Sequence, residues 1–332
     1  MRAAIKSLAT YVPPRLLTNA DLEKLVDTTN DWILQRTGIH ERHIVDPGVA
    51  TSDLGTKAAA DAVERAGLTP DDIDMIIVGT VTPDMLFPST ACLVQNKIGA
   101  SRAWGFDLSA ACSAFTYSLT VGAQMVSSGA ARHVLVIGAD VMSSIIDYTD
   151  RSTCVLFGDG AGAVVLGPIS DDSGYGILDF EHQVDGSGGH ALCMPAGGSR
   201  MPASHATVDE RLHFVKQEGQ TVFKFAVTKT GEMCERLLTR NCMTAKDIDL
   251  FVSHQANRRI IQSAAQRIGL PEDKVVINID RFGNTTAATI PLALNDAVSD
   301  GRLKTGDCVL LASVGAGFTA GAMLVRWGPD AG

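Results

Sequence analysis

Residues 62–80, AVERAGLTPDDIDMIIVGT, have a counterpart in residues 235–255, ERLLTRNCMTAKDIDLFVSHQ. Each stretch has the pattern of a helix, a short turn, Asp-Ile-Asp and then an apolar strand. Asp72 and Asp247 match at a separation of 175 residues, and the apolar runs that begin at His133 and Cys308 match at the same separation. A period this long indicates a duplicated domain, because solenoid repeats have periods of roughly 20 to 50 residues.

Apolar runs alternate with helix-compatible stretches within each half. The first half contains in turn a strand-like run, a helix-like segment, a second strand and a small-residue helix, at residues 75–78, 90–98, 104–108 and 111–128. This alternation predicts α/β layers with mostly parallel strands, and the apolar runs are typical of strands covered on both faces. We therefore expect two duplicated α/β halves, residues 1–170 and 171–332, packed as one body. Residues 171–215 have the composition of a loop-rich excursion over the site.

The composition limits the classes of function. The chain has 332 residues, of which 45% are hydrophobic, and a net charge of −9. Nucleic-acid-binding domains are usually basic, so the acidic balance argues against that class. No apolar run approaches the roughly 18 residues of a membrane span, and the N-terminus has no signal-peptide or transit-peptide pattern. The seven cysteines include no CxxC pair and predict free thiols in a reducing compartment. We expect a cytoplasmic protein that binds neither nucleic acid nor membranes.

Two glycine-rich stretches fit a dinucleotide-binding pattern, G-x-G-x-x-A, at residues 158–163 and 315–320. Such a loop must lead into a helix, whereas the residues that follow both stretches have the composition of strands. We interpret these glycines as tight turns between adjacent strands. His40 and His43 are spaced for a shared metal ion, but no third ligand lies nearby in the sequence. We expect no metal site there.

Three polar residues follow predicted strands, where open α/β sheets bind ligands. Cys112 begins a helical segment, and the positive end of a helix dipole favours a thiolate. His254 follows a strand at 250–253, and Asn284 follows an apolar strand at 275–279. Taken alone, each residue fits a buried structural role better than a catalytic one. Cys112 and Asn284 nevertheless lie at nearly equivalent places in the two halves, 172 residues apart, so we expect the strand ends to bring the three residues into one pocket.

Motifs of one enzyme family occur along the whole chain. They are DWI at 31–33, RTGI at 36–39, DLSAACSAF at 107–115, FGDGAG at 157–162, SHQAN at 253–257, GNTT at 283–286 and GAGF at 315–318. With these motifs the chain resembles β-ketoacyl-[acyl carrier protein] synthase III, a family of thiolase-fold enzymes that initiate bacterial type II fatty acid synthesis. One departure is Ala316, because the last glycine-rich turn of the family usually reads GGGF. The resemblance implies a thiolase-like α/β fold with its two halves layered as αβαβα.

The resemblance also implies a two-stage reaction that needs no metal or redox cofactor. Cys112 attacks the thioester of an acyl-CoA, expected to be acetyl-CoA, and the backbone N–H groups of Cys112 and Ala316 hold the oxyanion. Malonyl-[acyl carrier protein] then loses CO₂, while N–H groups of His254 and Asn284 hold the enolate oxygen. The carbanion attacks the acyl-Cys, which gives 3-oxoacyl-[acyl carrier protein].

Further residues take expected roles from the same resemblance. CoA binding is assigned to residues matching Thr28, Trp32, Arg36, Arg151 and Asn257. The acyl pocket is assigned to Phe87 and Phe157, with Phe87 reaching across a homodimer interface. The docking patch for the acidic carrier protein matches Lys224 and Arg259. Arg267 extends this patch, because it lies two turns from Arg259 on one face of a predicted helix.

Three other functions stay open on the sequence. A related condensing enzyme would take a branched or aromatic acyl-CoA starter, because the sequence does not reveal the shape of the pocket. A papain-like Cys-His-Asn hydrolase would have the same order of catalytic residues, but the duplicated α/β architecture and the lack of a secretion signal count against it. A non-catalytic acyl-CoA-binding scaffold would not need Cys112, His254 and Asn284 together.

Overall fold

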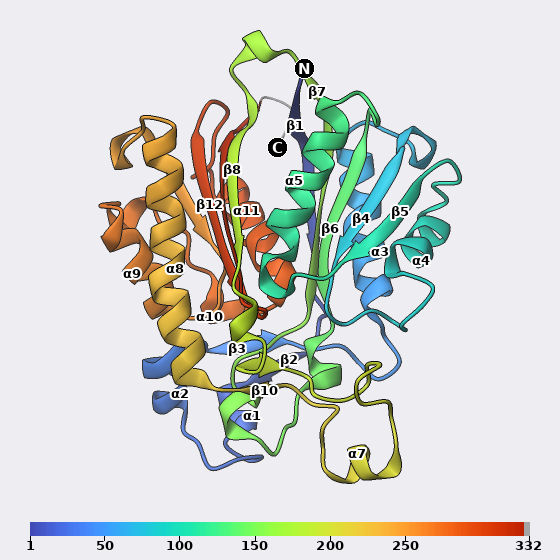
Figure 1. Ribbon diagram of the computed structural model, residues 1–332, viewed down its shortest axis with the longest axis vertical. Helices are drawn as coiled ribbons and strands as arrows, with labels where there is room; N and C mark the ends of the chain where they lie inside the picture. The colour runs from blue at the N-terminus through green and yellow to red at the C-terminus, as the bar shows by residue number, and fades with distance from the viewer. Residues whose placement is uncertain (329–332) are drawn as a thin grey trace.

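The computed structural model describes residues 1–328, which form two main β-sheets with helices between and outside them (Figure 1). The first sheet has the order β1-β7-β6-β4-β5, with bounds Arg2–Tyr11, Gly160–Ile169, Val134–Asp140, Met75–Gly79 and Trp104–Leu108. The second has the order β11-β12-β13-β8, with bounds Leu250–Ser253, Cys308–Gly315, Thr319–Arg326 and Gly176–Val184. Two short ribbons pair β2 with β3 and β9 with β10, at Leu16–Thr18, Glu41–His43, Leu192–Cys193 and Lys216–Gln217.

The helices form three layers around the two sheets. Helices α5 (Ala114–Ser127) and α11 (Thr289–Ser299) lie between the sheets (Figure 1). The outer faces are covered by α3 and α4 on the first sheet and by α8 and α9 on the second, with bounds Thr51–Arg65, Thr90–Ile98, Gly219–Arg240 and Arg258–Arg267. This is the predicted αβαβα arrangement. The shorter helices are α1, α2, α6, α7 and α10, at Asn19–Leu22, Asn30–Thr37, Arg151–Cys154, His205–Asp209 and Ile279–Phe282.

Both faces of the central strands are buried, which explains their unbroken apolar sequences. In β4, Met75 and Ile77 pack into the core between the two sheets, whereas Ile76 and Val78 pack into the core under α3 and α4. Successive side chains of a strand point to opposite faces, so a strand between two helical layers needs apolar residues at every position.

The two copies of the sequence repeat fold in the same way. A helix, a short 3₁₀ turn and a strand follow one another at α3, Pro70–Asp72 and β4, and again at α8, Ala245–Asp247 and β11. Both turns are capped alike, because Thr69 donates to Asp72 at 2.7 Å and Thr244 donates to Asp247 at 2.9 Å. In both copies the strand pairs in parallel with the next long strand, β6 or β12. The division into halves at residues 170 and 171 stays a prediction.

Two segments differ from their predicted structure. The predicted strand at 275–279 is wrong, because only Val275 pairs, in a single bridge to Phe251, and Ile279 already begins α10. The predicted loop-rich segment 171–215 contains the nine-residue edge strand β8 before its irregular part. Strand β8 carries Asp179 and Glu181, which pair with arginines of α8, so its sequence lacks an apolar strand pattern.

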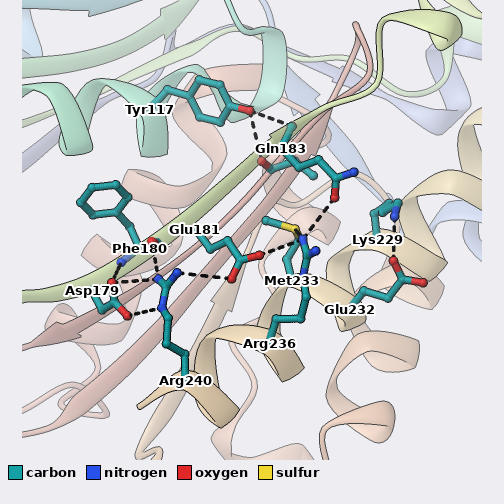
Figure 2. A network of polar contacts seen from close by, with 11 residues as sticks. Tyr117, Asp179, Phe180, Glu181, Gln183, Lys229, Glu232, Met233, Arg236 and Arg240 are labelled. Atoms are coloured by element: carbon teal, nitrogen blue, oxygen red, sulfur yellow. Dashed lines mark hydrogen bonds and ion pairs between the residues drawn. The ribbon is translucent and has the colours of Figure 1, made fainter.

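A polar network fixes α8 against β8 (Figure 2). Arg240 donates to both carboxylate oxygens of Asp179 at 2.8 Å, and Arg236 pairs with Glu181 at 2.8 Å. Tyr117 of α5 donates to the backbone carbonyl of Gln183 at 3.0 Å. The first turns of α8 form one wall of the site described below, so this network helps to set where that wall lies.

Candidate active site

Cys112 lies in the turn between β5 and α5. Ala111 has a φ of 48°, in the left-handed region that is strained for residues other than glycine, and Ala111–Ser113 form a 3₁₀ turn that leads into the helix. The thiol is therefore held at the start of a helix, as expected from the sequence. Its residue is only 7% exposed, yet it borders two cavities.

The first cavity, of about 150 Å³, brings Cys112, His254 and Asn284 together. We call it the donor cavity. His254 follows β11 directly, and its backbone N–H donates to the carbonyl of Ala312 in β12 at 2.8 Å. Asn284 reaches the cavity from the loop after α10, where it forms a bridge with Phe157. Its walls also include residues of β10, α8, the start of α9 and the turn between β12 and β13, among them Gln217, Phe223, Phe225, Asn257 and Phe318.

One short segment engages Nδ1 of His254 and Oδ1 of Asn284. The hydroxyl of Thr289 lies 2.7 Å from Nδ1 of His254, and the backbone N–H of Thr286 donates to Oδ1 of Asn284 at 2.9 Å. A side-chain amide whose oxygen accepts this bond has its NH₂ group left for other partners. Nε2 of His254 forms no hydrogen bond with the described residues, so it is also left for another partner.

Burial controls the protonation of the two titratable groups in the donor cavity. It raises the pKa of the Cys112 thiol to about 12, and the charge of Asp140 adds to this rise, while the adjacent backbone N–H opposes it. Burial also lowers the pKa of His254 to about 3, so the imidazole is neutral at pH 7. Desolvation of the charged form thus opposes the effect of the helix dipole on the thiol, and the expected thiolate stays a prediction.

Asp140 is a buried carboxylate at the end of β6 that the sequence analysis did not single out. Its Oδ1 accepts from the N–H of Val81 at 2.8 Å and from the hydroxyls of Thr80 and Thr82 at 3.0 and 2.9 Å. Its Oδ2 accepts from the N–H of Ala287 at 3.1 Å. Burial raises the pKa of Asp140 to about 6, against these hydrogen bonds. The carboxylate thus ties the segment beside Asn284 to the end of β4.

The second cavity, of about 140 Å³, is lined mainly by apolar side chains, and we call it the apolar cavity. Cys112 and Phe157 border both cavities. Ala316 also borders the apolar cavity, as does Cys193. Phe87 does not line it, since its residue is 83% exposed on the surface. The two residues expected at the acyl pocket therefore lie in different places within one chain.

The five residues expected to bind CoA are partly gathered around Trp32. The guanidinium of Arg151 lies 4.8 Å from the Trp32 ring centre, and that of Arg36 lies 5.9 Å away. Asn257 donates to the backbone carbonyl of Arg36 at 2.7 Å and lines the donor cavity, so it connects the two regions. Thr28 has a buried hydroxyl with no partner among the described residues.

The three residues expected at the docking patch lie on α8 and α9. Lys224 and Arg259 are exposed, and the guanidinium of Arg259 lies 5.2 Å from the ring of Phe223, which lines the donor cavity. Arg267 is engaged differently, because it pairs with Glu235 at 2.8 Å and donates to the carbonyl of Thr228 at 3.3 Å. Its charge is already partly neutralised by this partner.

Two kinds of feature are absent from the part of the chain that the structure describes. Within residues 1–328, no group of three His, Cys, Asp or Glu side chains is placed to hold a metal ion. No helix in this part of the chain is long and apolar enough to cross a membrane. The seven cysteines are all free thiols.

Known proteins resemble this chain over nearly its whole length. Residues 106–186 match the family model described as 3-oxoacyl-[acyl-carrier-protein (ACP)] synthase III, and residues 238–327 match the model of its C-terminal region. The β-ketoacyl-[acyl-carrier-protein] synthase III of Koribacter versatilis is 59% identical over 98% of both chains. The corresponding crystal structure from Thermus thermophilus is 42% identical, with a TM-score of 0.90, over 98% of this chain and 99% of that one. The structure from Aquifex aeolicus is 41% identical, with a TM-score of 0.89, over 98% and 100%.

Proposed function

The chain belongs to the 3-oxoacyl-[acyl carrier protein] synthase III family, and from this premise we propose how its residues perform the reaction. The protein is a condensing acyltransferase of the kind that initiates fatty acid synthesis. Its substrates are an acyl-CoA, with acetyl-CoA as the first candidate, and malonyl-[acyl carrier protein]. The observation that carries the proposal is the meeting of Cys112, His254 and Asn284 in the donor cavity.

In the first stage, the sulfur of Cys112 attacks the carbonyl carbon of the acyl-CoA. The thiol proton ends on the departing CoA sulfur, so the products are acyl-Cys112 and CoA. The negative oxygen of the tetrahedral intermediate needs N–H donors, which we assign to the backbone of Cys112 and Ala316. Burial raises the pKa of Cys112 and so disfavours its charged form, and the donors stabilise the charge that moves onto oxygen.

In the second stage, the malonyl thioester loses CO₂ and becomes an enolate. We assign the donors for its oxygen to Nε2 of His254 and the NH₂ group of Asn284, because their other polar atoms are engaged by Thr289 and Thr286. The enolate carbon attacks acyl-Cys112, and the new C–C bond forms as the bond to sulfur breaks. The thiolate of Cys112 takes up a proton, so the enzyme returns to its starting form.

The apolar cavity is the proposed place of the acyl chain. It adjoins Cys112, and Met142, Ile145 and Val215 are among its apolar lining residues. Phe157 forms part of its wall within the chain. We assign Phe87 to the cavity of the partner subunit, which is consistent with its 83% exposure.

The surface around β5 supports the proposal of a homodimer. This strand is the edge of the first sheet, and Trp104 within it is 53% exposed. Met85, Leu86 and Phe87 add exposed apolar side chains. Parallel sheet edges and large apolar patches are usually covered, and isologous dimers are the commonest way to cover them. Light scattering should give twice the 35.0 kDa chain mass, and a chain that stays monomeric at all concentrations would contradict the dimer.

The Trp32 cluster is the proposed site for the adenine end of CoA. The guanidinium of Arg151 lies over the Trp32 ring, and the two groups must move apart to admit an adenine between them. Arg36 and Asn257 continue from this cluster to the donor cavity. Thr28 offers an unpartnered hydroxyl near the start of α2.

The carrier protein is proposed to dock on Lys224 and Arg259, with Arg267 as an outer residue. Carrier proteins are acidic, and this chain has a net charge of −9, so attraction must come from a local basic patch. Screening acts over about 8 Å at physiological ionic strength, so added salt should slow the malonyl-carrier step. Lys224→Glu with Arg267→Glu should slow it too, while leaving acylation by acetyl-CoA unchanged. A carrier step that responds neither to salt nor to these changes would rule the patch out.

The reaction type is tested by its products. With acetyl-CoA and malonyl-carrier, the enzyme should release CoA and CO₂ in a one-to-one ratio and form 3-oxoacyl-carrier. A Cys-His-Asn hydrolase would instead release CoA and acetate without malonyl-carrier. Intact mass after exposure to a panel of straight, branched and aromatic acyl-CoAs will show which starter stays on the protein. We also assign the enzyme to the cytoplasm, in line with its seven free thiols.

A further inference from the structure

Thr289, the first residue of α11, is a buried residue whose hydroxyl has two neighbours. Its oxygen lies 2.7 Å from Nδ1 of His254 and 3.1 Å from the backbone carbonyl oxygen of Thr286. The hydroxyl has one proton to donate, and the carbonyl oxygen can only accept it. The position of this one proton therefore determines whether Nδ1 of His254 accepts or donates the hydrogen bond.

The two distances favour donation to the histidine. The hydroxyl is also placed to donate to the Thr286 carbonyl at 3.1 Å, but O–H···O hydrogen bonds are usually about 2.5–3.0 Å long, so this bond is the weaker of the two. The contact with Nδ1 has the length of a good bond. A neutral imidazole has one nitrogen with hydrogen and one without. If Nδ1 accepts the hydroxyl proton, the ring hydrogen must be on Nε2.

We propose that Thr289 is a positioning residue that keeps His254 in the tautomer with hydrogen on Nε2, so that the ring donates to the enolate oxygen. This inference rests on the proposed function and adds to it the residue that sets the polarity of one donor. The backbone N–H of Thr286 does the same for Asn284, by occupying its amide oxygen. One segment of six residues, 284–289, thus orients both donors.

Two other features of the site support this assignment. Burial keeps His254 neutral, with a pKa of about 3, so the choice lies between two neutral tautomers. The segment itself is anchored from the first sheet, where Asp140 accepts the N–H of Ala287. In addition, a ring with hydrogen on Nε2 cannot accept the thiol proton of Cys112. Acyl transfer should therefore be insensitive to Thr289, whereas decarboxylation and condensation should depend on it.

The test compares Thr289→Val, which keeps the size and removes the hydroxyl, with Thr289→Ser, which keeps the hydroxyl. Acylation of Cys112 by acetyl-CoA is followed by intact mass, and CO₂ release from malonyl-carrier is followed separately. We expect Thr289→Val to acylate at the parent rate and to decarboxylate about 10- to 100-fold more slowly, as when a metal-ligating histidine loses the partner that orients it. Thr289→Ser should stay within a few fold of the parent.

A spectroscopic readout makes the tautomer visible without activity. Long-range ¹H–¹⁵N spectra of protein labelled with ¹⁵N-histidine distinguish a nitrogen with hydrogen from a bare one, and His254→Ala identifies the signals of His254. The parent and Thr289→Ser should show hydrogen on Nε2, and Thr289→Val should lose that single pattern.

Several results would overturn the inference. They are a parent spectrum with hydrogen on Nδ1, a Thr289→Val enzyme that decarboxylates like the parent, and an equal loss in Thr289→Ser and Thr289→Val. A loss of acylation equal to the loss of condensation would also overturn it. If the parent releases no CO₂ from malonyl-carrier, the proposed function fails, and the spectra still decide which tautomer Thr289 imposes.

Discussion

The turns at the start of α5 and α11 have matching backbones. Ala111 begins the first with a φ of 48°, and Thr286 begins the second with a φ of 52°. Each of these residues is the first of a short 3₁₀ turn that leads straight into a helix between the sheets. The two residues are 175 positions apart, which is the separation of the repeat. Cys112 therefore matches Ala287, and Asn284 lies three residues before the equivalent place.

The two turns differ in the residue that lies beside the backbone N–H of their second residue, Cys112 or Ala287. Strand β6 ends at Asp140, whose carboxylate accepts the N–H of Ala287 at 3.1 Å. Strand β12 ends 175 residues later at Gly315, which has no side chain, and a Cβ there would lie 2.8 Å from the nitrogen of Cys112. The Ala287 amide is used to hold the structure, and we propose that the Cys112 amide binds a substrate oxygen. The same backbone conformation therefore anchors the segment at Ala287 in one half and, in the proposed function, binds the substrate oxygen at Cys112 in the other.

Cys112→Ala should give the largest effect, because it removes the nucleophile from the open turn. No acyl group should remain on the protein after exposure to acetyl-CoA, as read by intact mass. Some decarboxylation of malonyl-carrier should persist, because His254 and Asn284 are unchanged. Normal condensation by this variant would show that Cys112 is not the nucleophile.

Gly315→Ala should close the open turn. The added Cβ would lie within 3.0 Å of both the Cys112 nitrogen and the Thr319 hydroxyl, so something must move. Acylation should fall by about 10²- to 10³-fold, the cost of one lost oxyanion donor. The control is Gly198→Ala, since a Cβ at Gly198 meets nothing within 4 Å. Equal acylation rates in the two variants would mean that the space beside Cys112 is not used.

The sequence carries the information that is local to an element. The strands at β4, β5 and β11 follow from their apolar runs, and the placement of Cys112 and His254 follows from the strand ends before them. The roles of Asp140 and Thr289 could not be predicted. Their partners lie far along the chain, at Ala287 and His254, and neither residue belongs to a local motif.

Two further differences have the same origin. The strand expected at 275–279 has an apolar sequence, but only Val275 finds a pairing partner in the folded chain. Arg267 has the spacing of a docking residue, but Glu235 on the neighbouring helix already pairs with it. Propensity and spacing describe one element, whereas pairing depends on what the fold places beside it.

Asp140→Asn tests the supporting turn through the pH dependence of stability. The pKa of Asp140 is raised to about 6 by burial, above its value of about 3.9 in an unfolded chain. The folded state therefore favours the protonated form, and the contribution of Asp140 to stability is present below pH 4 and lost as the pH rises through 6. Between these limits the unfolding free energy of the parent should fall by about 3 kcal/mol relative to Asp140→Asn. A constant difference between the two proteins would contradict the raised pKa.

Trp32→Ala should have the smallest effect of this series and should act on the first stage alone. A stack between an aromatic ring and a guanidinium or adenine is worth about 0.5–2 kcal/mol, so the apparent affinity for acetyl-CoA should drop by roughly 2- to 30-fold. Malonyl-carrier contains no adenine, so its KM should not change. An equal rise in KM for both substrates would place Trp32 elsewhere in the reaction.

The most direct test of the division between the two turns is the intact mass of Asn284→Ala, taken after acetyl-CoA and again after malonyl-carrier. We expect one acetyl group to form on Cys112 at the parent rate. Malonyl-carrier should then consume this group about 10²- to 10³-fold more slowly than in the parent, because only an enolate donor is missing. A protein that is not acetylated, or one whose acetyl group is consumed at the parent rate, would contradict the claim that Cys112 performs acyl transfer and that Asn284, beside the supporting turn, stabilises the enolate.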